Sequence, residues 1–282
     1  MASHWRAASS LRQWMGAAGD AVVSVFFPGG CRLCERLLVR ASRLPICEEC
    51  LGSFPALPAR VCAVCGSPAL AASTLHPADN GPGDDGADVD DVDDRTCLAC
   101  RDRNYRFECA RSYAAYRGML VRAVVLLKFE KIEPLAAYFG ERLASVAKRE
   151  GLTADIVVPV PLHRARERER GFNQAELIAR EIAKRLKVPC KPILLTRTKA
   201  RPDKHILSNA ERWRIVRGAF ATRPGSQVDN KRVLLVDDVM TTGATLDACA
   251  GALLQAGAKS VVGLTVARTV RRETPTGIGE SV

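Results

Sequence analysis

Four pairs of cysteines, each spaced Cys-x-x-Cys, lie within the first hundred residues of this 282-residue chain. The pairs are Cys31/Cys34, Cys47/Cys50, Cys62/Cys65 and Cys97/Cys100. A Cys-x-x-Cys turn directs two sulfur atoms at one metal ion, and two such turns complete a tetrahedral zinc site. Eight thiolates therefore predict up to two zinc ions. Their role is structural, because four cysteines leave no coordination position open for a substrate.

The spacing leaves open which pairs share an ion. Pairing in sequential order is the simpler arrangement, and a crossed arrangement fits nearly as well. A redox role is a weaker alternative, because no thioredoxin-like pattern surrounds the pairs. The remaining cysteines, Cys109, Cys190 and Cys249, stand alone and are interpreted as small buried hydrophobes.

Location is predicted from the same cysteines together with the amino-terminal sequence. Without an export signal, eleven cysteines predict a reducing compartment, and the expected location is cytoplasmic. The most apolar window near the amino end, residues 21–27, is too short to cross a bilayer, so we expect no membrane span.

Composition divides the chain into four parts. We expect an amino-terminal segment at 1–30, the cysteine-rich zinc modules at 31–110, a larger domain at 111–270 and a disordered tail at 271–282. Residues 67–96 are rich in Gly, Pro, Ala and Asp, lack periodicity and predict a disordered acidic insertion. This insertion is either a solvated loop or an electrostatic mimic that competes with nucleic acid.

The rest of the chain is strongly basic. The formal net charge is +11, and residues 67–96 contribute −7, which leaves +18 on the remainder. Such an excess suits a polyanion, either a nucleic acid or a polyphosphate metabolite. With 47% apolar and 26% charged residues, the composition excludes wholesale disorder and a fibrous protein.

Beyond residue 110, apolar runs typical of strands alternate with helical patterns. Strands are predicted at 155–160, 193–196, 231–236 and 260–267. Helices are predicted at 119–147, interrupted at Glu133-Pro134, and at 174–186 and 244–255. Fully apolar strands alternating with helices predict an α/β fold, with a mostly parallel sheet between flanking helices.

The most informative segment is VLLVDDVMTTGAT, residues 233–245. An apolar strand leads to Asp237 and Asp238, and a turn containing Thr and Gly then opens a helix. Amides at a helix start bind a phosphate group, and a glycine permits close approach of the backbone. Two carboxylates instead suit vicinal hydroxyls or a magnesium ion. A sugar phosphate satisfies both halves of the segment.

This segment resembles the phosphoribosyl-pyrophosphate (PRPP) signature of type I phosphoribosyltransferases. Together with FFPGGCRLC, LKFEK, RGFNQ, AERWRIVRGAF and the Cys-x-x-Cys series, it resembles the ComF family of competence-associated proteins, which combine this fold with an amino-terminal double zinc ribbon. The resemblance covers most of residues 25–268. It departs in the segment between the second and third predicted strands, where the family usually has Gln near Lys204 and Asn near Ile215.

The resemblance implies roles for individual residues. Asp237 and Asp238 would contact the ribose hydroxyls, and Asp238 is a catalytic candidate from its place beside the ribose. The turn formed by Thr241, Thr242, Gly243, Ala244 and Thr245 would bind the 5′-phosphate. Arg170, Gly171 and Asn173 would contact the pyrophosphate. Arg164, Arg166 and Arg168 alternate with Glu and are interpreted as a solvated surface.

Two functions of different classes follow from these observations. In the first, the chain binds PRPP with magnesium as a phosphoribosyltransferase, in a setting of DNA uptake and natural transformation. In the second, it binds single-stranded DNA as a competence factor whose PRPP site is regulatory or vestigial. A protein-docking adaptor is the third possibility if both fail. The acceptor substrate and the oligomeric state are left open by the sequence.

Overall fold

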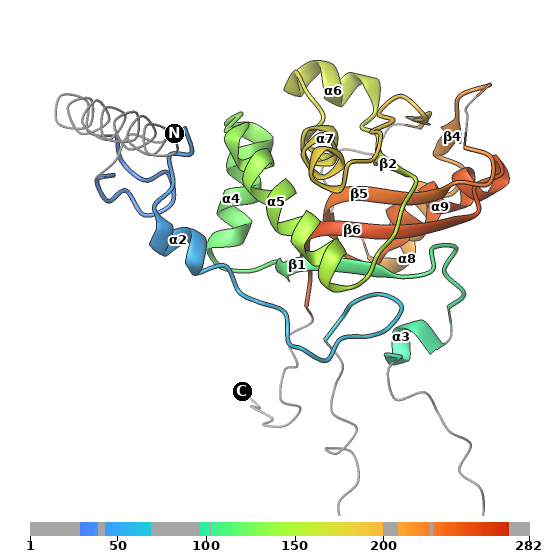
Figure 1. Cartoon of the computed structure of the whole chain (residues 1–282), viewed down its shortest axis with the longest axis horizontal. Helices are drawn as coiled ribbons and strands as arrows, with labels where there is room; N and C mark the ends of the chain where they lie inside the picture. The colour runs from blue at the N-terminus through green and yellow to red at the C-terminus, as the bar shows by residue number, and fades with distance from the viewer. Residues whose placement is uncertain are drawn as a thin grey trace, which may run out of the picture.

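A sheet of four parallel strands forms the centre of the molecule (Figure 1), in the order β1-β6-β5-β2. The strands span Ala110–Ala115 (β1), Ser260–Arg268 (β6), Arg232–Met240 (β5) and Ile156–Pro159 (β2). The computed structural model describes residues 29–38, 43–68, 96–101, 103–199, 208–225 and 228–270. The predicted tail, most of the acidic insertion and nearly all of the amino-terminal segment lie outside these residues.

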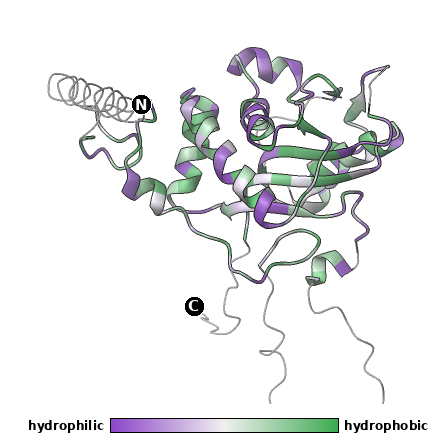
Figure 2. Ribbon diagram, viewed as in Figure 1, coloured by the Kyte–Doolittle hydropathy of each residue, from purple (hydrophilic) through white to green (hydrophobic). Residues whose placement is uncertain are grey.

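Alternating side chains of β5 pack into two cores on opposite faces of the sheet. Leu234 and Val236 join the core formed with α4 (Met119–Phe129), α5 (Pro134–Arg149) and α7 (Gln174–Leu186). Val233 and Leu235 join the core formed with α9 (Ala244–Gln255) and the end of α8 (Asn209–Val216). Strands buried on both faces require this apolar sequence. The α/β prediction of a parallel sheet with flanking helices is confirmed, and Figure 2 shows β5 as mainly hydrophobic.

Local sequence signals account for several helix ends. Pro134 occupies the first turn of α5, where its missing N–H costs nothing, so the predicted break after α4 is confirmed. Asn173 caps α7 by accepting a hydrogen bond from the Ala175 amide at 3.0 Å. Ser208 and Glu211 form a reciprocal capping box at the start of α8.

One predicted strand lies outside the parallel sheet. Residues 193–196 were expected in the parallel sheet, but β3 (Leu195–Arg197) pairs antiparallel with β4 (Phe220–Thr222) in a separate two-stranded sheet. The fourth parallel strand is β1, whose Ala-rich sequence has a weak strand signal. Its Ser112 is buried and shares a 2.6 Å hydrogen bond with Thr265 of β6.

The cysteine-rich segments pack against both cores. They contain two short helices, α2 (Glu48–Gly52) and α3 (Leu98–Arg101). Cys31, Cys50 and Phe54 join the core of α4 and α5, and Phe54 lies 6.3 Å from Phe139 between ring centroids. Cys62, Cys65 and Cys100 join the core of α9. Each cysteine cluster is therefore anchored to one face of the larger domain.

Candidate functional site

A cavity of about 440 Å³ opens at the carboxyl ends of β2 and β5. Its lining comes from β5, the segment that follows β2, the end of α4, the exposed helix α6 (Arg164–Arg170), α8 and the turn before α9. Ligands of open α/β sheets bind at this edge of the sheet. One lysine, four arginines and two aspartates line the cavity, beside His163: Lys128, Arg166, Arg170, Arg197, Arg212, Asp237 and Asp238.

The acidic pair lies on β5 itself, whereas the sequence predicted that the strand ends there. Strand pairing with β6 continues to Met240, opposite Arg268. Asp238 is 5% exposed, forms an ion pair with Lys128 at 2.9 Å and accepts a hydrogen bond from Gln174 Nε2 at 2.5 Å. A buried carboxylate requires such partners. Both acids are thus held by the sheet and its neighbours.

Asp237 has an unusual protonation equilibrium. Burial, together with the adjacent charge of Asp238, raises its pKa from 3.8 to about 7, against the opposing hydrogen bond from the Asp238 amide. That amide donates to Asp237 Oδ1 at 2.8 Å. A carboxylate with a pKa near neutrality can exchange a proton at physiological pH.

The turn of residues 241–245 requires its glycine. Gly243 has φ +79°, and a Cβ atom there would lie 2.9 Å from Met240 Cε and 3.1 Å from Tyr105 Cε1. The Ala244 amide donates to Thr242 Oγ1 at 3.3 Å. The first amides of a helix have no acceptor within the helix, so this helix start provides donors for an anion.

Arg170 combines several contacts at the cavity wall. Its guanidinium lies 5.1 Å from the ring centroid of Phe129, and its Nη1 donates to Gln174 Oε1 at 2.5 Å. Burial lowers the pKa of Arg170. Taking charge out of water is costly, so an anion in the cavity would find a cation whose solvation is already reduced.

The predicted ligand-contacting residues fall into two groups. Asp237, Asp238, Arg170, Thr241, Thr242, Ala244 and Thr245 line the cavity. Three others shape it without lining it. Gly171 ends α6 at φ +88°, Gly243 forms the turn, and Asn173 is buried and donates to the Val160 carbonyl at 3.0 Å.

Some lining residues were not identified from the sequence as site residues. Arg166 lines the cavity although a solvated surface was expected, while Arg164 and Arg168 are exposed. Gln174 is the last residue of the RGFNQ motif, so the motif itself could have identified it as a site residue. Arg197 and Arg212 come from segments far away in the sequence, and Arg212 donates to Thr241 Oγ1 at 3.3 Å. No local pattern identifies such residues.

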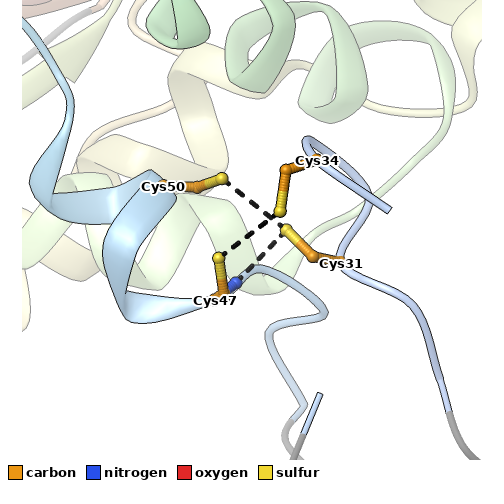
Figure 3. A group of neighbouring side chains, drawn as sticks. All are labelled: Cys31, Cys34, Cys47 and Cys50. Carbon is orange, nitrogen blue, oxygen red and sulfur yellow. Dashed lines mark hydrogen bonds between the residues drawn. The ribbon is translucent and has the colours of Figure 1, made fainter. Parts of the chain in front are cut away.

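The eight paired cysteines form two clusters in sequential order, which decides between the two predicted arrangements. In the first cluster the side chains converge (Figure 3), with sulfur separations of 3.9 Å for Cys31/Cys50 and 3.7 Å for Cys34/Cys47. Zinc–sulfur bonds of about 2.3 Å in a tetrahedron place sulfurs about 3.8 Å apart. This cluster therefore fits a zinc ion.

The second cluster repeats this geometry. Its Cys65 and Cys97 sulfurs are 3.7 Å apart, and the Cys97 amide donates to Cys62 Sγ at 3.3 Å. The side-chain hydrogen bond from Cys65, together with backbone amides, lowers the pKa of Cys62 to about 4. The thiolate is the form that binds metal. Both clusters thus provide the donor set of a structural zinc site.

Comparison with known proteins places this geometry in a family. Residues 173–276 match the phosphoribosyl transferase domain. DNA utilization protein YhgH of Salmonella typhimurium (strain LT2) is 31% identical over 248 residues, which cover 86% of this chain and 98% of that protein. Competence protein ComFC of Bacillus subtilis (strain 168) is 27% identical, over 79% of this chain and 84% of that protein. The chain belongs to the ComF family.

ComF membership agrees with the fold, a type I phosphoribosyltransferase domain preceded by cysteine clusters that fit zinc ribbons. Among solved structures, the glutamine PRPP amidotransferase from B. subtilis complexed with ADP and GMP is 25% identical, with a TM-score of 0.33. The match covers 47% of this chain and 26% of that one. Among its described residues, this ComF protein has no helix long and apolar enough to cross a membrane.

Proposed function

We propose that this ComF protein binds PRPP in a magnesium-dependent manner and acts as a phosphoribosyltransferase-type protein in DNA uptake. One observation carries the proposal: a single basic cavity holds both a helix start with free amide donors and an acidic pair, Asp237 and Asp238. Phosphate groups need the first feature, and sugar hydroxyls need the second. The printed names of the relatives, a DNA utilization protein and a competence protein, support the cellular setting.

The 5′-phosphate is assigned to the turn of residues 241–245. Amides at the start of α9 donate to it, with further donors from the hydroxyls of Thr241 and Thr245, both of which line the cavity. The ribose hydroxyls donate to Asp237 and Asp238. Lys128 and Gln174 fix the Asp238 carboxylate, so little reorganisation is needed when the ribose binds.

The pyrophosphate is assigned to the basic wall beside Arg170. Gly171 and Asn173 set the course of the backbone between α6 and α7, and Arg166 adds a second guanidinium. Magnesium prefers carboxylate and phosphate oxygens, and Asp237 offers a carboxylate that lines the cavity. When bound, the ion would neutralise charge on the leaving pyrophosphate.

In the transfer step, the bond between C1 of the ribose and the pyrophosphate oxygen breaks, and a bond from C1 to a nitrogen nucleophile forms. Positioning and electrostatic stabilisation supply most of the rate enhancement in such reactions. The nucleophile must also lose a proton in this step. Asp238, the catalytic candidate predicted from the sequence, would also hold the ribose through its carboxylate, which is ion-paired with Lys128.

Calorimetric titration of the zinc-replete protein with PRPP and MgCl₂ tests the proposal. We expect binding by the wild type and loss of binding in the Asp237→Asn/Asp238→Asn variant. The matched control is Asp155→Asn, because Asp155 pairs with Arg232 at the opposite end of the strands. Absence of binding by the wild type, or equal affinity in the double variant, would refute the site. Pyrophosphate release across amines and nucleobases then tests turnover.

We also propose that both cysteine clusters hold structural zinc. The sulfur separations and the amide hydrogen bonds to sulfur support this assignment. Inductively coupled plasma mass spectrometry of the purified protein should give two zinc ions per chain. A zinc content near zero in protein purified without chelators would contradict it.

A second candidate function, binding of single-stranded DNA, is favoured by the surface beside the cavity. Helix α6 contains four arginines and no buried residue, and it is largely hydrophilic in Figure 2. Phe129 is 66% exposed and lies against Arg170. An exposed aromatic ring beside arginines provides a stacking platform for an unpaired base.

Fluorescence anisotropy with a labelled oligo(dT) tests this second candidate. We expect affinity to fall with rising salt, and Phe129→Ala to weaken binding about 5-fold or more, because base stacking contributes about 1–3 kcal/mol. Arg149→Ala is the control, because this exposed arginine lies at the far end of α5. No binding by the wild type at low salt would exclude DNA binding, and equal losses in both variants would exclude the Phe129 platform.

A further inference from the structure

The second cysteine cluster, Cys62/Cys65/Cys97/Cys100, lies close to the phosphate-binding turn. We propose that its metal centre holds the turn of residues 241–245 in the binding conformation, with Arg268 and Tyr105 as the positioning residues that connect the two sites. The inference rests on the proposed function where it concerns PRPP. The conformation of the turn can be measured without any ligand.

Arg268 provides the electrostatic part of the connection. It is 6% exposed, and its Nη2 donates to Cys65 Sγ at 3.2 Å. Its Nε and Nη1 have no hydrogen-bond partner among the described residues. A buried guanidinium needs compensating charge, and a zinc ion with four thiolates carries a formal charge of −2. Arg268 is therefore suited as the counter-charge of this metal centre.

The backbone of β6 extends this connection to the end of β5. Arg268 is the register partner of Met240, and the Thr269 amide donates to the Met240 carbonyl at 3.0 Å. Thr269 itself lines the cavity. Arg268, which contacts the cysteine cluster, and Thr269, which lines the cavity, are therefore consecutive residues. Both lie at the end of β6, beside the start of the turn.

Tyr105 provides the packing part of the connection. Tyr105 lies five residues after Cys100 in the sequence. Its hydroxyl donates to the Thr242 carbonyl at 3.1 Å. The ring stacks on Phe107 with centroids 4.7 Å apart, and Trp213 of α8 lies 5.8 Å away. Because Gly243 has no Cβ, the turn can approach the rings of Tyr105 and Phe107 closely.

Arg106, the residue after Tyr105, contacts the helix that follows the turn. The Arg106 amide donates to Asp247 Oδ1 at 2.7 Å, and its guanidinium Nε donates to Asp247 Oδ2 at 3.0 Å. Asp247 is 3% exposed and lies in the first turn of α9. The chain that leaves Cys100 thus contacts the turn at Thr242 and the helix start at Asp247.

The first cysteine cluster provides an internal control. It joins the core of α4 and α5, on the opposite face of the sheet from α9. Arg32, which lies between Cys31 and Cys34, forms an exposed ion pair with Glu130. No hydrogen bond or ion pair between the described residues joins this cluster to the turn.

Two readouts on the full-length zinc protein test the proposal: zinc release to a chromophoric chelator and hydrogen exchange of the amides of residues 241–247. In Arg268→Met we expect one of the two zinc ions to bind about 10- to 100-fold more weakly, as for loss of an outer-shell partner, and exchange at the turn to accelerate. Arg268→Lys should restore part of both. Arg32→Met should change neither.

Tyr105→Phe separates positioning from metal binding. We expect its zinc release to stay at the wild-type rate, while exchange at the turn accelerates and PRPP affinity falls about 3- to 10-fold, the usual effect of one lost hydrogen bond. Unchanged exchange at the turn in both Arg268→Met and Tyr105→Phe would overturn the inference, as would equal weakening of both zinc sites in Arg268→Met. If the wild type binds no PRPP, the proposed function fails, but the exchange measurements still decide this inference.

Discussion

The ion pair between Lys128 and Asp238 allows a quantitative test of how the site is built. The Lys128 side chain is 20% exposed, that of Asp238 is 8% exposed, and 2.9 Å separates Lys128 Nζ from Asp238 Oδ2. With an effective dielectric constant of about 20, opposite charges at this distance attract by about 6 kcal/mol. Desolvation offsets part of that energy, and removing one partner of a buried pair costs about 3–5 kcal/mol.

We expect Lys128→Met to lower the free energy of unfolding by about 3 kcal/mol, the lower end of this range, because Gln174 still donates to Asp238. A double-mutant cycle with Asp238→Asn should give a coupling energy of about 2 kcal/mol. Urea denaturation followed by circular dichroism measures all four proteins, and equal m values confirm that the unfolding transitions are comparable.

The control pair is Lys184 and Glu181, on an exposed part of α7. The Lys184 side chain is 70% exposed, so its coupling energy should be about 0.3 kcal/mol. A coupling energy below about 0.5 kcal/mol for Lys128 and Asp238 would refute the argument that the site depends on a desolvated pair. In that case solvent would screen the cavity wall much as it does the surface of α7.

Three further predictions concern the turn, the acidic pair and the clusters. Gly243→Ala should destabilise the protein by about 2–4 kcal/mol in urea denaturation, because it adds both backbone strain and a close contact. Gly225→Ala, with φ +74° and open space, should cost only about 1–2 kcal/mol. Asp237 binds a proton more tightly in the folded protein, so the free energy of unfolding should fall as pH rises from about 4 to about 7. Asp237→Asn should remove that fall, and an unchanged pH profile would contradict the raised pKa. Chelation of the two proposed zinc ions should make residues 29–68 sensitive to protease; continued resistance would show that the clusters fold without metal.

Elements with strong local periodicity were predicted from the sequence. Helix α7 has its predicted bounds of 174–186, and the alternation of apolar strands with helices gave the layered architecture. The sequence does not predict strand β1 because its Ala, Arg and Ser residues have weak strand preference, and its pairing with β6 forms only in the folded chain. The end of β5 was placed too early because two acids interrupt the apolar run, although the backbone ladder continues to Met240.

The candidate site also contains residues that the sequence predicts and residues that it does not predict. Asp237, Asp238 and Thr241 were predicted because their chemistry lies within one short segment. Arg197 and Arg212 lie in other segments of the sequence and approach the cavity only after the chain folds. The raised pKa of Asp237 likewise depends on burial, which is a property of the folded molecule. Distance along the chain, more than chemical type, determined which residues were found.

The cavity has a base of buried strand ends and a side formed by the exposed helix α6, and the two tolerate amino-acid substitution differently. Its base is formed by strand ends continuous with fully buried side chains such as Leu235 and Val236, where substitutions cost several kcal/mol. One side comes from α6, which buries none of its residues and where surface substitutions usually change stability by less than about 0.5 kcal/mol. Sequence change can therefore accumulate at the exposed positions of α6 that do not line the cavity, such as Arg164 and Arg168, while the strand ends stay constant.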